Sequence, residues 1–441
     1  MNVLLINHYA GSPDLGMEFR PYYLAREWVR RGHEVTIAAA SFSHVRTKNP
    51  KVPSAGKESW VDGIRYLWLS TPRYGGNDMR RVRNMGAFIF RLFFHHGKIL
   101  RLVRPDVVIA SSTYPLDIFP AWLMARRAGA RLVFEVHDLW PLSPVELGGM
   151  SPRHPFILVM QGAEDFAYRA ADRVVSMLPE ARAHMERHGM ARDKFVYIPN
   201  GVDLEEWRNH SVKIPETHEA VFSELRRQKG LIVGYAGAHG LANNLNTLLE
   251  AAEILKRGPF WFVLAGQGPE KEALRQRARS IGLERVVFLP TVPRKAVPDL
   301  LSRMDLLYIG LRPEPLFRFG ISPNKLMDYM MAGKPVLSAI EAGNDPVGES
   351  GCGLTVAPGD APALAGSLKA LAALSPAARE KMGEKGRRYV TARHDYGVLA
   401  ERFLRVLENK AGSLPGAGDA GRAAAGKRTV QADFSRERQG S

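Results

Sequence analysis

Short apolar stretches alternate with segments of helical periodicity along most of this chain. Residues 3–7 (VLLIN) form the first stretch, and a turn-rich loop separates them from apolar residues at helical spacing between Met17 and Arg31. Strands that alternate with helices form parallel sheets with helices on both faces. The pattern therefore predicts an α/β fold.

The alternation runs through the chain twice, with a polar, irregular stretch in between. The strands expected in the first series are residues 3–7, 33–40, 106–111, 132–138, 172–178 and 195–199. Those expected in the second series are residues 231–237, 261–266, 286–290, 305–311, 335–340 and 353–358. We interpret the two series as two doubly wound, Rossmann-like domains that face a cleft, as the length of 441 residues allows.

The expected boundaries follow from where each series starts and stops. They are 1–205 for the first domain, 206–229 for a linker, 230–393 for the second domain and 394–410 for a C-terminal helix. Residues 411–441 are rich in Ala, Gly and Arg and poor in large apolar residues, so they cannot bury enough surface to offset the entropy of ordering. We expect a disordered tail there.

Composition constrains the compartment and the partners. The single cysteine, Cys352, allows no intramolecular disulfide, which fits a reducing compartment. We find no secretory signal and no run of about 18 apolar residues, so we expect a cytoplasmic protein that is soluble or peripheral to a membrane. The net charge of +16 indicates an anionic partner, which could be a nucleic acid, a lipid surface or a phosphorylated substrate.

Four loops join a predicted strand to a predicted helix and could bind phosphate. Unpaired N–H groups and partial positive charge make such helix starts suitable for anions. The loops are residues 10–16, which end at Gly16; residues 234–244, with Gly237, His239 and Asn244; residues 265–274; and residues 319–337. A plain tight turn is the alternative for the first and third loops.

The fourth loop is the most distinctive. Pro323 suits the first turn of a helix, so Asn324 and Lys325 would lie where an anion binds. Asp328 follows Lys325 by three residues, and both side chains can face the cleft. The alternative is an ion pair on the surface of an ordinary helix.

His137 is the main acid–base candidate. It ends a predicted buried strand, from which it can reach the cleft, and a histidine exchanges protons near neutral pH. A core histidine with satisfied hydrogen bonds is the alternative. We recognise no nucleophile elbow, phosphate-binding Walker loop or metal-ligand spacing, so we expect catalysis without a metal or other cofactor.

The segment from Arg73 to Arg104 combines basic and aromatic residues in a helical pattern, which suits the interface of an anionic bilayer. The alternative is a domain helix whose apolar side belongs to the core. The residues expected at the acceptor or the membrane are Arg80, Arg81, Arg83, Phe93 and Phe94.

Several segments, taken together and in order, resemble the retaining family-4 (group 1) glycosyltransferases of the GT-B fold. They are residues 24–37 (LAREWVRRGHEVTI), 137–141 (HDLWP), 171–179 (ADRVVSMLP), 197–203 (YIPNGVD), 265–270 (AGQGPE), 320–337 and 351–360 (GCGLTVAPGD). The HDLWP and SPNKL sequences favour the bacterial O-antigen and capsule branch that includes fucosaminyltransferase-like enzymes.

The resemblance implies an acceptor site in the first domain and a nucleotide-sugar site in the second. Asp328 matches an acidic residue, usually Glu, that holds the ribose hydroxyls; His137 matches a histidine near the reacting sugar; and Gly16 matches a glycine near the diphosphate. The donor's own phosphate would accept the acceptor proton, so no protein nucleophile is required. The donor-binding residues expected in all are Gly16, Gly237, His239, Asn244, Arg318, Gly320, Ile321, Ser322, Asn324 and Asp328.

The sequence departs from the family pattern at two places. Gly320 stands where the family has a first acidic residue, and Ala238 and Asn244 stand where it often has Arg and Lys to neutralise the leaving diphosphate. We expect Lys325 to supply that charge, assisted by Arg318 and by the helix that starts near Asn244.

The predicted activity is retaining transfer of a sugar from a nucleotide-sugar to a lipid-linked saccharide at the inner face of a membrane. The branch favours a UDP-linked donor, with an N-acetylated deoxyhexosamine as the candidate sugar. A sugar-nucleotide 2-epimerase of the same fold and a catalytically silent scaffold are the alternatives. A nucleic-acid-binding protein is disfavoured because no binding module is recognisable.

Overall fold

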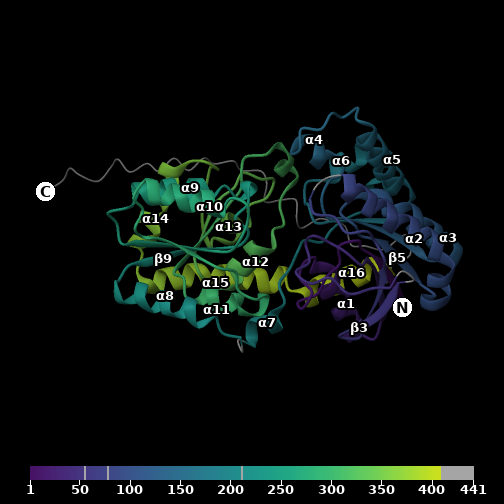
Figure 1. Ribbon diagram of the computed structural model, residues 1–441, viewed down its shortest axis with the longest axis horizontal. Coiled ribbons are helices and arrows are strands. Elements are labelled where there is room, and N and C mark those ends of the chain that lie inside the picture. Colours follow the sequence, from purple (N-terminus) through teal and green to yellow (C-terminus); the bar gives the residue numbers. More distant parts are fainter. Residues whose placement is uncertain (54–55, 77–78, 210–211, 409–441) are drawn as a thin grey trace.

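The computed structural model describes residues 1–53, 56–76, 79–209 and 212–408. The predicted tail at 411–441 lies outside these residues. Figure 1 shows two α/β domains side by side, each built on one sheet. The two strand series predicted from the sequence therefore correspond to two sheets.

The first sheet has eight strands in the order β3-β4-β2-β1-β5-β6-β7-β8. All neighbours are parallel except the antiparallel pair β3 and β4. The strands are β1 (Asn2–Ile6), β2 (Glu34–Ala40), β3 (Lys57–Val61), β4 (Ile64–Leu69), β5 (Val107–Ala110), β6 (Arg131–Val136), β7 (Arg173–Ser176) and β8 (Phe195–Tyr197).

The second sheet is entirely parallel, in the order β11-β10-β9-β12-β13-β14. Numbered from β9, this is the 3-2-1-4-5-6 order of the Rossmann fold. The strands are β9 (Leu231–Ala236), β10 (Phe260–Ala265), β11 (Val286–Leu289), β12 (Leu306–Gly310), β13 (Val336–Ala339) and β14 (Gly353–Val356).

All twelve predicted strands form, and the prediction missed only the hairpin of β3 and β4. Its two-residue turn is Asp62-Gly63, where both residues have positive φ (48° and 78°). Asp-Gly between two apolar runs is a strong hairpin signal, because such turns need positive φ at both positions. The signal was therefore present in the sequence.

Helices cover both sheets. Those of the first domain are α1 (Arg20–Arg30), α2 (Met79–Val103), α3 (Ile118–Ala128), α4 (Leu142–Glu146), α5 (Pro155–Ala170) and α6 (Arg182–Arg187). The expected linker holds most of α7 (Leu204–Arg208) and all of α8 (Glu216–Arg227). Next come α9 (Leu245–Ile254), α10 (Lys271–Ser280), α11 (Val297–Ser302), α12 (Asn324–Met331), α13 (Pro346–Ser350), α14 (Ala361–Ala373), α15 (Pro376–Arg393) and α16 (Tyr396–Glu408).

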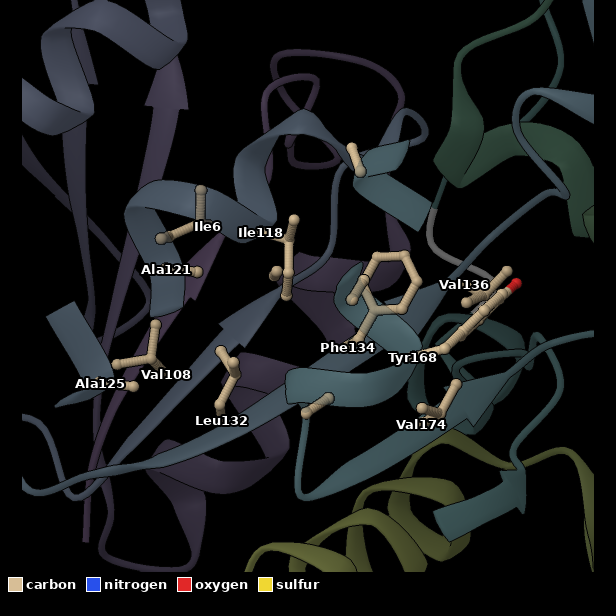
Figure 2. Close-up of a cluster of buried hydrophobic side chains, with 14 of the residues drawn as sticks. Ile6, Val108, Ile118, Ala121, Ala125, Leu132, Phe134, Val136, Tyr168 and Val174 are labelled. Atoms are coloured by element: carbon tan, nitrogen blue, oxygen red, sulfur yellow. The ribbon is translucent and has the colours of Figure 1, made fainter. Parts of the chain in front are cut away.

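The first sheet buries both of its faces. Leu4 and Ile6 of β1 belong to a cluster that also contains Phe134 and residues of α3 and α5. Figure 2 shows part of this cluster, including Ile6 and Phe134. Val3 and Leu5, which point the other way, belong to a second cluster with α1 and α16. Because successive side chains enter opposite clusters, these strands read as continuous apolar runs.

The last helix returns to the first domain. The α16 residue Phe403 packs its ring against Trp28 of α1, with ring centroids 5.2 Å apart. Tyr396 stacks on Tyr23 at 4.8 Å. The predicted C-terminal helix thus completes one face of the first sheet, although the second domain precedes it in the sequence (Figure 1).

Candidate active site

Loops at the carboxyl ends of both sheets meet where the domains touch. The Glu180 amide, after β7, donates to the Phe319 carbonyl, after β12, at 3.0 Å. The Asn200 side-chain amide, after β8, donates to the Ser322 carbonyl at 2.8 Å. Ligands of open α/β sheets bind outside these strand ends, so the junction of the two domains is the place to look for a site.

Lys325, in the first turn of α12, reaches the loop that follows β9. Its ammonium donates to the Tyr235 hydroxyl at 3.1 Å and to the side-chain carbonyl of Asn243. A Cβ on Gly237 would lie 3.1 Å from that hydroxyl, so a larger residue at position 237 would crowd the contact between Lys325 and Tyr235. Burial lowers the pKa of Lys325 to about 8. The ammonium thus lies beside the position where the family often has a basic residue.

His239 lies in the loop after β9 and contacts the glycine loop that follows β10. The ring is fully buried, and neither ring nitrogen has a hydrogen-bond partner among the described residues. The His239 amide donates to the Gln267 carbonyl at 2.8 Å, and a Cβ on Gly268 would lie 2.3 Å from the His239 carbonyl oxygen. Burial, then Lys271 and Lys325, lower the pKa of His239 to about 4, so the ring is neutral. Asn244, with φ 45°, begins α9 beside this loop.

Asp328 lies one turn along α12 and is paired. Both carboxylate oxygens accept from Arg294, at 2.5 and 2.8 Å. Arg294 also lies 3.5 Å from Glu206, which accepts from the Tyr23 hydroxyl at 2.6 Å. Sequence reasoning missed Arg294; the one available signal was its place in the loop after β11, at the carboxyl edge of the sheet.

Gly320 has a conformation that disfavours a side chain. Its φ is 97°, and an added Cβ would lie 2.4 Å from Cδ of Pro179 in the first domain. The next two residues also bond to neighbouring loops: the Ile321 amide donates to the Asn344 side chain at 2.7 Å, and the Ser322 hydroxyl accepts from the Asn200 amide at 2.8 Å. Loop packing thus explains the missing acidic residue.

Arg318 crosses the domain junction. Its guanidinium donates to both carboxylate oxygens of Glu146, on α4, at 2.7 Å each. Asn324 is the first residue of α12 and directly precedes Lys325 in the sequence. The donor roles expected for Arg318 and Asn324 stay predictions.

His137 follows β6 and belongs to a buried polar network. Its Nε2 lies 2.9 Å from the Ser111 hydroxyl and 3.2 Å from Glu135, which bonds to Arg20 at 2.9 Å. Burial raises the pKa of Glu135, but Arg20, His137 and Ser111 together lower it to about 2. A permanent carboxylate therefore orients the His137 ring, as a general base or a hydrogen-bond donor to a sugar requires.

The first glycine loop lies on the same side. Gly16 has φ 97°, and an added Cβ would lie 2.7 Å from the Thr47 amide nitrogen. Asp14 in this loop lies 3.9 Å from Lys295, which follows β11. The loop therefore approaches the second domain next to Arg294.

Comparison with known proteins agrees with this arrangement. The model of the glycosyl transferase 4-like domain matches residues 16–201, and that of the group 1 glycosyl transferases matches residues 230–373. A 2-deoxystreptamine N-acetyl-D-glucosaminyltransferase from Streptomyces fradiae is 31% identical over 359 residues, which cover 79% of this chain and 80% of the relative. This chain belongs to the group 1 glycosyltransferases.

Solved structures support the fold of this glycosyltransferase. Sucrose-phosphate synthase from Thermosynechococcus elongatus superposes with a TM-score of 0.69 at 18% identity, over 92% of this chain and 98% of that one. The Anabaena protein HepE, in complex with UDP, gives 0.63 at 18% identity, over 92% and 99%. The predicted GT-B architecture is confirmed.

In this glycosyltransferase, one face of α2 is buried in the core and the other is exposed. Phe88 and Leu92 are buried in the core, whereas Phe90 and Phe94 are 66% and 72% exposed. Phe93 is 37% exposed and Arg80 and Arg83 are also exposed, but Arg81 turns inward and donates to the Tyr9 hydroxyl at 3.2 Å. One face of the helix therefore belongs to the core, and contact of the exposed face with a membrane stays a prediction.

Among the described residues, one group could share a cation: Glu164 and Asp165 of α5 with His188. The Gln161 amide nitrogen lies within 2.9 Å of an atom of each, so the group is already hydrogen-bonded. None of these residues follows a strand.

Within the same described ranges, no helix has the length and apolar character needed to cross a bilayer. Catalysis without a metal stays a prediction.

Proposed function

We propose that this glycosyltransferase transfers a sugar, with retention, from a UDP-sugar to a lipid-linked saccharide in cell-surface polysaccharide synthesis. The observation that carries the proposal is the ammonium of Lys325, beside Tyr235 and Asn243 in the loop before α9. A positive charge there can stabilise the diphosphate as it leaves, although Ala238 and Asn244 replace the family's usual basic residues.

The remaining donor groups would bind around this charge. The ribose hydroxyls would donate to Asp328, and the diphosphate would also meet the start of α9 at Asn244 and the loop that contains Gly16. HepE, which has the same fold, was solved with UDP, and this supports UDP as the nucleotide tested first.

In the reaction, the bond from the anomeric carbon to the donor phosphate breaks and the acceptor oxygen bonds to the same face of that carbon. The acceptor's proton passes to an oxygen of the leaving phosphate, so the chain needs no nucleophile of its own. His137, oriented by Glu135 and Ser111, would bind the reacting sugar. Neither role requires a metal.

The acceptor and membrane assignments rest on the first domain. Exposed Phe90 and Phe94 on α2, and exposed Leu158 and Val159 on α5, offer apolar side chains to a bilayer surface. The basic residues of α2 suit anionic lipids of the inner face. An O-antigen chain mannosyltransferase of Escherichia coli, 24% identical over 71% of this chain and 79% of its own length, supports a role in O-antigen synthesis; the lipid link of the acceptor is part of the proposal.

The donor sugar is proposed from the likeness in residues 137–141 and 322–326, which favours an N-acetylated deoxyhexosamine. The family match favours transfer over the epimerase alternative and over nucleic-acid binding. An assay of UDP-sugar conversion without acceptor separates the two sugar reactions: formation of a 2-epimer in that assay would contradict the transferase.

Calorimetric titration with UDP, GDP and ADP, with and without EDTA, tests the donor site. We expect selective UDP binding that survives EDTA and is lost in Asp328→Ala. No binding of UDP, or equal binding of all three nucleotides, would contradict the proposed donor. Loss of binding in EDTA would contradict metal independence alone.

A further inference from the structure

Arg294 holds the residue that the proposed function assigns to the ribose. We propose that Arg294 is a positioning residue of the donor site, which fixes the Asp328 carboxylate so that its remaining lone pairs accept the two ribose hydroxyls of a nucleoside diphosphate. This inference rests on the proposed donor site and adds a residue for which no role was expected from the sequence.

The pair has the geometry of a fork. Two guanidinium nitrogens of Arg294 donate separately to the two oxygens of Asp328, at 2.5 and 2.8 Å. A carboxylate has about four acceptor sites, so one lone pair on each oxygen stays open to another donor. Two adjacent hydroxyls match two such oxygens.

The length of the Asp328 side chain gives Arg294 a reason to hold its carboxylate in place. Aspartate has one methylene fewer than the glutamate that the family usually has, so the carboxylate must be held at a different place above α12. Arg294 approaches from the loop after β11, across from α12. The Asp328 side chain is 7% exposed and that of Arg294 19%, so water competes little for the pair.

Arg294 is itself braced by the other domain. Its Nε lies 3.5 Å from Glu206, and Glu206 accepts from the hydroxyl of Tyr23, on α1. The Arg294 guanidinium therefore pairs with two carboxylates, those of Asp328 and Glu206, and the three side chains together carry a net negative charge when both carboxyl groups are ionised. Such a site favours the hydroxyl donors of a ribose over the negatively charged diphosphate.

The test is the affinity for UDP, measured by calorimetry on the full-length protein. We expect Arg294→Ala to weaken UDP binding about tenfold, because the Asp328 carboxylate would no longer be held in the position from which it accepts both ribose hydroxyls; a tenfold change corresponds to about 1.4 kcal/mol. Arg294→Lys should not restore it, because an ammonium lacks the fork. Arg303→Ala is the matched control, since Arg303 pairs with Glu219 at 2.9 Å and does not contact Asp328.

A double-mutant cycle separates positioning from mere stability. In the Asp328→Asn background, where the side-chain oxygen can still accept from the ribose, Arg294→Ala should cause no further loss of affinity, because the residue acts through the carboxylate. Unchanged or tighter UDP binding by folded Arg294→Ala would overturn the inference; tighter binding would mean that the guanidinium blocks Asp328. If Asp328→Ala itself binds UDP normally, the proposed donor site fails as well, so the two failures are distinguishable. Should Arg294→Ala not fold, Arg294→Gln takes its place.

Discussion

At Lys325, burial opposes the charge that the reaction needs. Burial lowers the lysine pKa to about 8, so the ammonium dominates below that pH and is lost above it. The side chain nevertheless keeps two hydrogen-bond acceptors, Tyr235 and Asn243. Lys325 is therefore positively charged at neutral pH and loses this charge at mildly alkaline pH.

We predict that kcat falls as the pH rises through about 8, because the charge at Lys325 disappears. Lys325→Ala should lower kcat by about 10²–10³ at pH 7, the usual loss when one stabilising donor is removed. Initial rates from pH 6 to 10 provide the measurement. Lys325→Arg is the control and should keep its rate above pH 8; an unchanged profile in Lys325→Ala would contradict the assignment.

The same shift has a consequence for stability. Because the folded pKa lies below the ordinary 10.5, the unfolded chain binds more protons between about pH 8 and 10.5, and this group makes stability rise with pH in that window. We predict that Lys325→Met is more stable than the wild type at pH 7, where the buried charge costs most. Urea unfolding at pH 7 and pH 10 tests this: the gain should shrink at pH 10.

Gly320 shows why the family's acidic residue cannot simply be restored. We predict that Gly320→Glu and Gly320→Ala both destabilise the protein, by about 1–3 kcal/mol, because φ is positive and Pro179 occupies the space of a Cβ. Thermal unfolding measures the loss. Gly282→Ala, a positive-φ glycine with nothing near its Cβ, is the control for backbone strain alone. Higher activity in a stable Gly320→Glu variant would refute this account.

At the scale of elements, α2 buries one set of apolar side chains and exposes another. One side belongs to the core through Phe88 and Leu92, and the other exposes Phe90 and Phe94. The apolar residues on the buried face are explained by the core, so only those on the exposed face are relevant to the proposed membrane contact.

We predict that Phe90→Ser with Phe94→Ser reduces flotation with phosphatidylglycerol vesicles several-fold while UDP affinity stays unchanged, because these side chains lie outside the core. Ile254→Ser is the matched control, because Ile254 is an exposed apolar residue on α9 of the second domain. Equal flotation of the double variant and the wild type would count against docking through α2.

At the scale of the whole molecule, the chain crosses between the domains more than once. The α16 helix returns to pack on α1, and its Phe403 is fully buried against Trp28. The Trp28 indole also donates to the Ala400 carbonyl at 3.1 Å. The stability of the first domain therefore depends on the last described helix.

We predict that Phe403→Ala destabilises the first domain by about 3–5 kcal/mol, the usual cost of truncating a buried Phe. Hydrogen exchange should show the loss of protection in α1, although the substitution lies more than 370 residues away in the sequence. Arg405→Ala on the same helix removes only a surface pair with Glu401 and should have little effect. Loss of protection confined to the second domain would contradict this packing role.

The sequence by itself determined the fold class and placed the candidate site residues at strand ends and on one helix. Buried parallel strands leave apolar runs, so twelve strands were predictable, as was the strand end at His137, whereas β4, whose run is interrupted by Arg65, was missed. Lys325 and Asp328 share one helix, so their proximity follows from helical spacing.

Only the tertiary structure decided the partners of these residues. Arg294 lies 34 residues before Asp328, and Asn243 lies 82 residues before Lys325. Gly320 meets Pro179 across the domain junction, and α16 covers α1 from the opposite end of the chain. Periodicity reports which side of an element is buried, but not what covers it, because long-range partners depend on how separate elements pack in space.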